Sequence, residues 1–406
     1  MRNPSVIVAA IGTSHYENVE YRFNDGTTIP AKYFLVGLVD MLKPDTVVVL
    51  LTEDARILQW TSVDGAGIGD LLKQRDVNVI AVDIPKGANE AEAWQIFELI
   101  NSHIPERAEV ILDITHGLRS IPVLMLLATF YLQRVRDITI SNIFYGALEA
   151  VDRSNHTKPA YSLGHFLTLL DWAGGVEVFK QTGDPKRLAE LLDARNTSVR
   201  KTYTGGPDGE RLPTRLKTVS TTLLSLSQAL GVIRPIEVME YASQLQQNLE
   251  SAADESRTWA KPFALIFDQM RDVFTPLGLT DPLEHSKQQR FIAAQVNLIE
   301  WYIRYEQFDA ASLLLRELIV TWYMFNKGQT DISNVEARKN IEGDLHRHFE
   351  NDKRDDLGGL WKSVTEIRND IAHIGMQKSP KPAKKLSALI SKAFDDFKHL
   401  LASGNP

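Results

Sequence analysis

Five continuous apolar runs lie in the first 150 residues, and they restrict the fold more than any other feature of the chain. Helix-period stretches separate several of them, at 31–42, 91–100 and 121–135. A strand that is apolar on both faces has to be covered on both faces, as in a parallel sheet flanked by helices. The sequence therefore predicts a doubly wound α/β domain. Its predicted strands are 6–11, 46–51, 77–83, 109–114 and 138–145.

After about residue 160 the pattern changes, and apolar residues recur at the three- and four-residue spacing of helices. A break in this pattern is expected at Gly174-Gly175, and residues 205–209, Gly-Gly-Pro-Asp-Gly, are the best candidate for a mobile loop. We therefore predict an α/β domain followed by an all-α part. The predicted divisions are an N-terminal domain at 1–160, a helical linker region at 161–275 and a C-terminal helical domain at 276–406.

The overall composition narrows the class of protein. With 406 residues, 44% of them hydrophobic, the chain is expected to be globular throughout. Its net charge of -7 argues against broad nonspecific binding of nucleic acid, so any basic surface must be local. The chain has no cysteine, which excludes disulfides, thiol catalysis and cysteine-ligated zinc. No stretch has the pattern of a signal peptide or a membrane span, and we expect a soluble cytoplasmic protein.

The most specific segment of the first domain is 113–120, Asp-Ile-Thr-His-Gly-Leu-Arg-Ser, which follows a predicted strand. In open α/β sheets, ligands bind beyond the carboxyl ends of strands, near helix N-termini. Ser120 is expected to cap the next helix, and Gly117 to let the backbone approach a ligand. The hydroxyl of Thr115 suits a ribose or phosphate, and Arg119 suits a phosphate. We predict a site for an anionic, hydroxyl-rich ligand, formed here by Asp113, Thr115, His116, Gly117, Leu118, Arg119 and Ser120.

Two further loops are expected at the same edge of the sheet. The loop Gly12-Thr13-Ser14-His15 follows the first predicted strand, and the loop Thr52-Glu53-Asp54 follows the second. Gly12, Thr13, Ser14, Thr52 and Glu53 are their predicted ligand contacts. Because the carboxyl ends of parallel strands meet at one edge, these loops should join the same site. Taken alone, Gly12-Thr13-Ser14 is better explained as an ordinary strand-to-helix turn.

A second polar group lies near the C-terminus, in the hexapeptide 368–373, Arg-Asn-Asp-Ile-Ala-His. At about 100° per residue, His373 falls opposite the apolar stripe of the predicted helix, and Asn369 lies one turn before it. Arg368 sits at the edge of the stripe. Such residues are common on solvated helices, but together they suit the cleavage of a phosphodiester. The predicted stripe consists of Leu357, Leu360, Val364, Ile367, Ile371 and Ile374.

Both polar groups resemble motifs of known families. Residues 113–117, Asp-Ile-Thr-His-Gly, are similar to the D-x-T-H-G motif of CRISPR-associated accessory proteins with a CARF domain, a Rossmann-like sensor of cyclic oligoadenylates. Segments 12–14 with Tyr16, 21–23, 47–53 and 164–172 occupy the expected places around it. Residues 368–373 resemble the R-N-x-x-x-H signature of HEPN ribonucleases. The chain thus resembles a CARF–HEPN ribonuclease of type III CRISPR systems at both ends, with a weakly determined middle.

This resemblance implies an endoribonuclease of antiviral defence that needs no metal or cofactor and is switched on by a cyclic oligoadenylate, with cyclic tetra-adenylate favoured. Its substrate would be single-stranded RNA, and its products would carry a 2′,3′-cyclic phosphate. Its site would join two protomers of a homodimer, alone or in an oligomer of dimers. His373 would perform acid–base work, Arg368 would stabilise the phosphorane charge, and Asn369 would orient a partner or the phosphate.

Several alternatives stay open at this point. The chain is also explained as a ligand-sensing dimer whose helical bundle binds RNA or protein without catalysis, or as a HEPN toxin gated by another nucleotide. Whether the sensor domain slowly cleaves its own activator is undecided, with Thr13, Ser14, His116 and Arg119 as candidate participants. The lysine-rich stretch 378–385 is better explained as a basic linker between helices than as an RNA contact.

Overall fold

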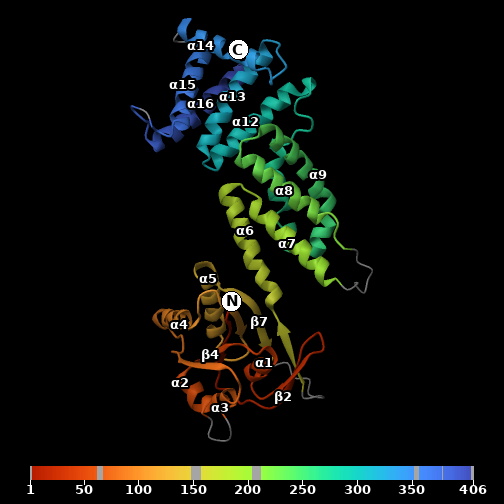
Figure 1. Cartoon of the computed structure of the whole chain (residues 1–406), viewed down its shortest axis with the longest axis vertical. Coiled ribbons are helices and arrows are strands. Elements are labelled where there is room, and N and C mark those ends of the chain that lie inside the picture. The colour runs from red at the N-terminus through yellow and green to blue at the C-terminus, as the bar shows by residue number, and fades with distance from the viewer. Residues whose placement is uncertain are drawn as a thin grey trace. The chain divides into compact units, whose positions relative to one another are not determined.

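The chain divides into two compact units, Met1–Leu170 and Asp171–Pro406. The first is α/β and the second is helical, as the change of pattern near residue 160 predicted (Figure 1). The predicted loop at 205–209 lies outside the described residues. The computed structural model describes residues 2–61, 67–147, 157–203, 212–351, 356–376 and 378–403.

One sheet organises the first unit. Within the described residues it has eight strands in the order β3-β2-β8-β7-β6-β1-β4-β5. Neighbouring strands are parallel except in the pairs β2–β3 and β7–β8. This mostly parallel sheet confirms the predicted fold class. The strands are β1 Ser5–Ile11, β2 Val19–Arg22, β3 Thr28–Ala31, β4 Thr46–Leu51, β5 Asn78–Asp83, β6 Glu109–Asp113, β7 Thr139–Gly146 and β8 Thr157–Ser162.

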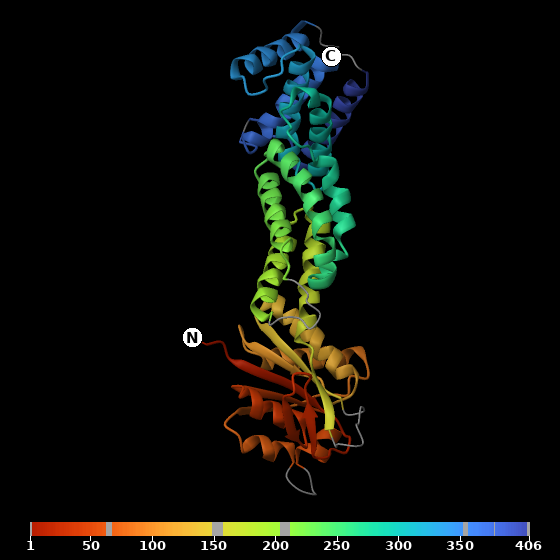
Figure 2. The same cartoon turned by 90° about the vertical axis from the view of Figure 1, so that its right-hand side faces the viewer.

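Helices cover both faces of this sheet (Figure 2). Successive residues of a central strand point to opposite faces, so Leu51 packs in a core with α1 and α3 while Leu50 packs in a second core with α4 and α5. This is the reason for the continuous apolar runs in the sequence. The helical segments are α1 Phe34–Leu42, α2 Glu53–Ala55, η1 Arg56–Trp60, α3 Ile68–Lys73, α4 Glu90–His103, α5 Ser120–Val135 and η2 Gly164–Leu167.

Strands β2, β3 and β8 were not predicted. Each is short and partly exposed, and none contains an apolar run. Pro30 and Pro159 also argue against a strand, although Pro30 is tolerated because β3 lies at the edge of the sheet. The fully buried Tyr21 is the side chain that joins β2 to the core.

The second unit is helical throughout its described residues. A large hydrophobic cluster extends from Trp172 in α6 to Phe397 in α16, and a smaller one contains Met239, Leu279, Phe291 and Ala294. The long helices α7, α8 and α9 run side by side (Figure 2). The segments are α6 Thr168–Thr182, α7 Lys186–Thr202, α8 Leu216–Gly231, α9 Pro235–Trp259, α10 Lys261–Ala264, α11 Phe267–Phe274, η3 Thr275–Leu277, η4 His285–Lys287, α12 Gln288–Arg304, α13 Phe308–Asn326, α14 Val335–Asn351, α15 Asp356–Ala372 and α16 Ala383–Ser403.

The expected break at Gly174-Gly175 is wrong, because both residues lie inside α6. A β-carbon on Gly175 would lie 3.0 Å from Leu191 and 3.1 Å from Leu188, both on α7. This glycine therefore allows α6 and α7 to pack closely rather than ending a helix.

Candidate functional site

A cavity of about 380 Å³ opens at the carboxyl ends of strands β1, β4, β5, β6 and β7. All three polar loops that the sequence singled out reach it, as expected for an open parallel sheet. The first turn of α5 also lines it through Ile121 and Pro122. The predicted ligand-binding residues in its wall are Gly12, Thr13, Ser14, Thr52, Thr115, His116, Gly117, Leu118 and Arg119.

Three of the predicted ligand-binding residues lie outside this wall. Glu53 is exposed in the first turn of α2, Asp113 is fully buried at the end of β6, and Ser120 is the exposed first residue of α5. Ser120 is also not the helix cap that we expected. The N–H of Ile121 donates to the carbonyl of Leu118 at 2.9 Å, so the turn has begun before Ser120, and Arg119 occupies the cap position.

Two glycines let the first and third loops touch through their backbones. A β-carbon on Gly12 would lie 3.1 Å from the backbone nitrogen of Gly117. Gly117 itself has a φ of +100°, which side chains rarely adopt, and a β-carbon there would lie 3.0 Å from that of Ala10. A side chain at either position would push the loops apart, so these glycines set the width of the cavity.

His116 forms the inner part of the cavity wall. It is 3% exposed, and its ring lies edge-on to Tyr16 with 4.5 Å between the ring centroids. Burial, reinforced by the charge of Lys158, lowers its pKa to about 3, so the imidazole is neutral at pH 7. Among the described residues neither ring nitrogen has a hydrogen-bond partner. A neutral imidazole of this kind offers one donor and one acceptor to a ligand.

Asp113 fixes the shape of the loop instead of facing the cavity. Its Oδ1 accepts the N–H of Thr115 at 3.0 Å, and the Thr115 hydroxyl accepts the N–H of Gly146 at 2.8 Å, which joins the loop to β7. Burial raises the pKa of Asp113 to about 6 despite the bond from Thr115. Its charge adds to the effect of burial in raising the pKa of Tyr21. Asp113 therefore holds the backbone of Thr115 in place and does not line the cavity.

The cavity is also lined by Asp54, the last residue of the predicted second loop, and by Tyr16, just after the first loop. Sequence reasoning missed Lys86 and Tyr145, which line it as well. Lys86 Nζ lies 2.7 Å from Asp54 Oδ2, and this pair brings a cation to a wall that also holds Arg119. Lys86 could have been predicted, because it follows a correctly predicted strand, and ligands bind beyond the carboxyl ends of such strands. The cavity thus combines cations, hydroxyls and a helix N-terminus, a set that suits an anionic ligand.

The second predicted group lies at the end of α15. Arg368 and Asn369 are half-buried, and Arg368 Nη1 donates to Asn369 Oδ1 at 3.1 Å. His373 is exposed, and its N–H donates to the carbonyl of Asn369 at 2.9 Å. The helix carries these three residues at its C-terminal end, with Leu360 and Val364 packed in the core behind it.

The predicted stripe fails at its last residue. Leu357, Leu360, Val364 and Ile367 are buried, but Ile374 is 79% exposed. The helix ends at Ala372, and Ile374 has a φ of +54°, so the helical spacing no longer applies to it. For the same reason His373 lies in the turn beyond the helix and not on its outer face.

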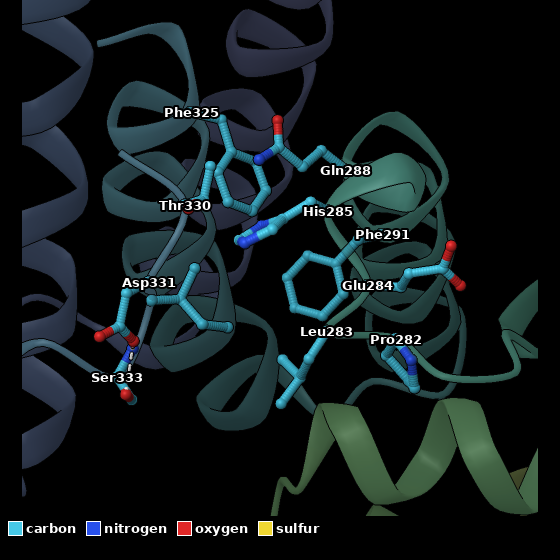
Figure 3. A pocket seen from close by; sticks show the side chains of 11 residues that line it. Pro282, Leu283, Glu284, His285, Gln288, Phe291, Phe325, Thr330, Asp331 and Ser333 are labelled. Carbon is cyan, nitrogen blue, oxygen red and sulfur yellow. Dashed lines mark hydrogen bonds between the residues drawn. The ribbon is translucent and has the colours of Figure 1, made fainter. Parts of the chain in front are cut away.

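A cavity of about 290 Å³ in the second unit contains none of the predicted site residues (Figure 3). Phe291 and Phe325 contribute aromatic rings whose centroids are 6.2 Å apart, with His285 reaching in beside them (Figure 3). The carboxylate of Asp331 at its edge already accepts two hydrogen bonds from Ser333. We assign it no function.

The described residues contain no group of three or more His, Cys, Asp or Glu side chains placed to hold a metal ion. None of the helices in the same part of the chain combines the length and the apolar character that a membrane span requires.

Two models of known protein families match parts of this chain. Residues 6–149 match the family model of the CARF domain of the CRISPR system endoribonuclease Csx1. Residues 168–277 match the model of the second domain of the CRISPR-associated protein MJ1674. With its mostly parallel sheet, the first unit is a Rossmann-like CARF domain, and a helical region follows it. The predicted division at residues 160 and 275 stays a prediction.

The similarity of this chain to two individual proteins is low. The chain is 22% identical over 302 residues to the CRISPR-associated protein MJ1674 of Methanocaldococcus jannaschii, which covers 73% of this chain and 42% of that protein. It therefore spans less than half the length of this relative. A structure of Enterococcus italicus Csm6 bound to cyclic hexa-2′-fluoro-hexa-dAMP aligns with 98% of this chain and 94% of its own, at 12% identity and a TM-score of 0.43. That degree of likeness bears on neither the fold nor the function of this chain.

Proposed function

We propose that the protein is a cytoplasmic endoribonuclease of type III CRISPR antiviral defence, activated by a cyclic oligoadenylate. The observation that carries this proposal is the polar cavity in a CARF domain, combined with Arg368, Asn369 and His373 at one end of a helix in the second unit. The helical unit would contain a HEPN ribonuclease domain within residues 276–406.

The activator would bind through its phosphates and its bases. Thr13, Ser14 and Thr115 surround the cavity with hydroxyls, and Lys86 and Arg119 provide cations for phosphates. The favoured ring is cyclic tetra-adenylate, whose symmetry suits a pocket shared by two copies of the domain. To turn the enzyme from almost all inactive to almost all active, the ring must favour the active state by about 5.5 kcal/mol.

An exposed apolar stripe on α5 supports pairing of two first units. It starts at Leu118 in the cavity wall, just before the helix, and continues from Val123 along α5 at four-residue spacing. A second copy packed on this stripe would bring two cavities together. Its members are between 49% and 59% exposed: Leu118, Val123, Leu127, Tyr131 and Val135. The exposed Trp94 of α4 is linked to Tyr131 through ring contacts of both with Phe97.

Cleavage would use the nucleophile of the RNA itself. The 2′-oxygen would attack the adjacent phosphorus, and the bond to the 5′-oxygen would break, leaving a 2′,3′-cyclic phosphate and a 5′-hydroxyl. His373 would transfer the proton and Arg368 would stabilise the charge of the phosphorane. Asn369 would orient Arg368 through the 3.1 Å hydrogen bond between them. A homodimer would supply two copies of this set to one linkage, and no metal or cofactor enters the step.

One assay tests the proposal. Purified protein and fluorescent single-stranded RNA are incubated in EDTA with cyclic tetra-adenylate, with cyclic hexa-adenylate, or without either ring. We expect cleavage only with a ring, and 2′,3′-cyclic phosphate ends. Ring binding without cleavage would favour a sensor that only binds RNA or protein. Cleavage that neither ring stimulates would favour a HEPN toxin gated by another nucleotide.

A further inference from the structure

The segment after α15 turns back toward the helix that it leaves. Ile374 and Gly375 have φ values of +54° and +67°, which reverse the direction of the chain. The N–H of Gly375 donates to the carbonyl of Asp370 at 3.1 Å, and that of Met376 to the carbonyl of His373 at 2.8 Å. A β-carbon on Gly375 would lie 3.6 Å from that of Pro380, so the two arms of this turn are in contact.

Asp370 holds the returning arm. This third residue of the predicted catalytic hexapeptide is only 2% exposed, although it carries a carboxylate. Its Oδ2 accepts the backbone N–H of Lys381 at 2.9 Å, across eleven positions of sequence. Shortly afterwards the N–H of Lys385 donates to the carbonyl of Pro382, where α16 begins. The basic loop, defined as residues 378–385 and including the start of α16 at Ala383, is therefore tied to the helix end that carries Arg368, Asn369 and His373.

The basic loop is strongly cationic in an otherwise acidic chain. Lys378, Lys384 and Lys385 are exposed, and Lys381 is half-buried. Between Ile371 and Phe394 the sequence contains no Asp or Glu, whereas the whole chain has a net charge of -7. Within the described residues, none of these four lysines forms an ion pair with a carboxylate. The N-terminus of the 21-residue helix α16 adds a partial positive charge at the same place.

We propose that the basic loop binds the phosphate backbone of single-stranded RNA beside the linkage to be cut, and that Asp370 is its positioning residue. This inference rests on the proposed nuclease function and adds a substrate-binding element to it. Four lysines distributed over eight residues, three of them exposed, suit the successive phosphates of a strand better than one compact anion. The linker interpretation of this stretch does not explain why a buried carboxylate fixes it there.

RNA binding separates this inference from catalysis. A fluorescent RNA with 2′-O-methyl riboses lacks the nucleophilic hydroxyl, so its Kd for the full chain is measured by anisotropy without cleavage. The test variant is Lys378→Gln, Lys384→Gln and Lys385→Gln combined. For single strands, each phosphate contact contributes about 0.7 to the magnitude of the slope of log K against log salt concentration. Removing three contacts should therefore reduce the magnitude of this slope by about 2. At 0.1 M salt the variant should bind the RNA at least about tenfold more weakly than the unaltered protein.

The matched control is Lys180→Gln, Lys186→Gln and Lys201→Gln combined, which changes the net charge equally at exposed lysines of α6 and α7. Its Kd and slope should equal those of the unaltered protein. Equal binding by the loop variant and the control would overturn the inference. So would loss of binding to phosphatidylserine vesicles by the loop variant with unchanged RNA binding, because the loop would then recognise a lipid surface. Activator-dependent cleavage by the unaltered protein separately tests the proposed function.

The part played by Asp370 is tested by rescue. Asp370→Ala should lower the salt slope to the value of the loop variant and raise KM for cleavable RNA more than it lowers kcat. Adding Asp370→Ala to the loop variant should then cause little further loss of RNA binding, since both changes disable the same RNA-binding segment. Asp370→Asn keeps an oxygen that accepts the Lys381 N–H and should restore the slope. A normal slope in Asp370→Ala, or a full additional loss in the combined variant, would show that Asp370 does not position the loop.

Discussion

Lys86 and Asp54 form an ion pair with 2.7 Å between Nζ and Oδ2, and both line the cavity at the carboxyl ends of the strands. Their side chains are 61% and 53% exposed, so the pair adds little to stability and is easily exchanged for another partner. Asp54 would repel an anionic ligand once Lys86 was removed. We therefore expect Lys86→Ala to weaken the binding of cyclic tetra-adenylate by about tenfold to a hundredfold. Asp54→Asn should strengthen it several-fold.

Titration calorimetry at two salt concentrations measures these changes. Lys73→Ala removes an exposed lysine from the C-terminal end of α3 and should leave the affinity unaltered. If Lys86→Ala bound the ring as tightly as this control does, Lys86 would not be a phosphate contact.

Asp113 leads to a prediction about pH. Its folded-state pKa of about 6 is above its ordinary value of 3.8, so its contribution to stability is full below pH 3.8 and is lost as the pH rises through 6. The amide of Asp113→Asn does not ionise and can still accept the Thr115 N–H. The variant should therefore gain stability relative to the unaltered protein between pH 5 and 8, on the order of 2 kcal/mol.

Urea unfolding at pH 5 and pH 8, followed by circular dichroism, provides the measurement. Asp45→Asn is a useful comparison, because hydrogen bonds from Ser5 lower the pKa of this carboxyl and no gain is expected at pH 8. A difference between Asp113→Asn and the unaltered protein that did not grow with pH would contradict the burial argument.

The apolar stripe on α5 predicts a defect in pairing. Leu127 lies in its middle and is 59% exposed, so Leu127→Lys should place a charge in the proposed contact without disturbing the core. We expect the dimer to dissociate at micromolar concentration, with a parallel loss of activator affinity. Light scattering after gel filtration measures the mass. Leu265→Lys, at an 83% exposed residue of the second unit, should keep the dimer. A dimeric Leu127→Lys protein would exclude this face as the contact.

The fold was predictable where burial dictates the sequence. The five predicted strands lie between two helical layers and must be apolar on both faces, which leaves a clear signal. Strand β2 has one fully buried residue, Tyr21, and its position depends on pairing with β8, which is far away in sequence. Local composition contains no information about such a pairing.

The candidate site was predictable to a similar degree. The strand-end rule located the cavity loops after β1, β4 and β6, and it applies equally to the loop after β5, which was not predicted to join them. Lys86 lies in that loop, and its closeness to Asp54 depends on the pairing of β5 with β4. At the other site, helical spacing continues through Ile374, while the turn at Ile374 and Gly375 reverses the chain. Periodicity shows which residues a helix would bury, but not where the helix ends.

The last prediction concerns Arg368 and His373. Packing in the core does not account for these two side chains, because His373 is exposed and the half-buried Arg368 donates a hydrogen bond to Asn369. If they act on RNA, Arg368→Ala and His373→Ala should each lower kcat for RNA by about 10²- to 10⁴-fold. Activator affinity should be unchanged, because neither residue lines the cavity of the first unit.

Single-turnover cleavage of fluorescent RNA at saturating activator measures the rate, and calorimetry measures the affinity. His346→Ala is the matched control, because it removes another exposed histidine, one that pairs with Glu350 on α14. Its rate should be normal. If Arg368→Ala or His373→Ala cleaved as fast as His346→Ala, that side chain would not take part in the chemistry. Loss of both cleavage rate and activator binding would instead point to a damaged fold. Arg368→Lys separates the two explanations, because it preserves the positive charge but not the planar guanidinium. This variant should keep its affinity for the activator while RNA cleavage stays slow.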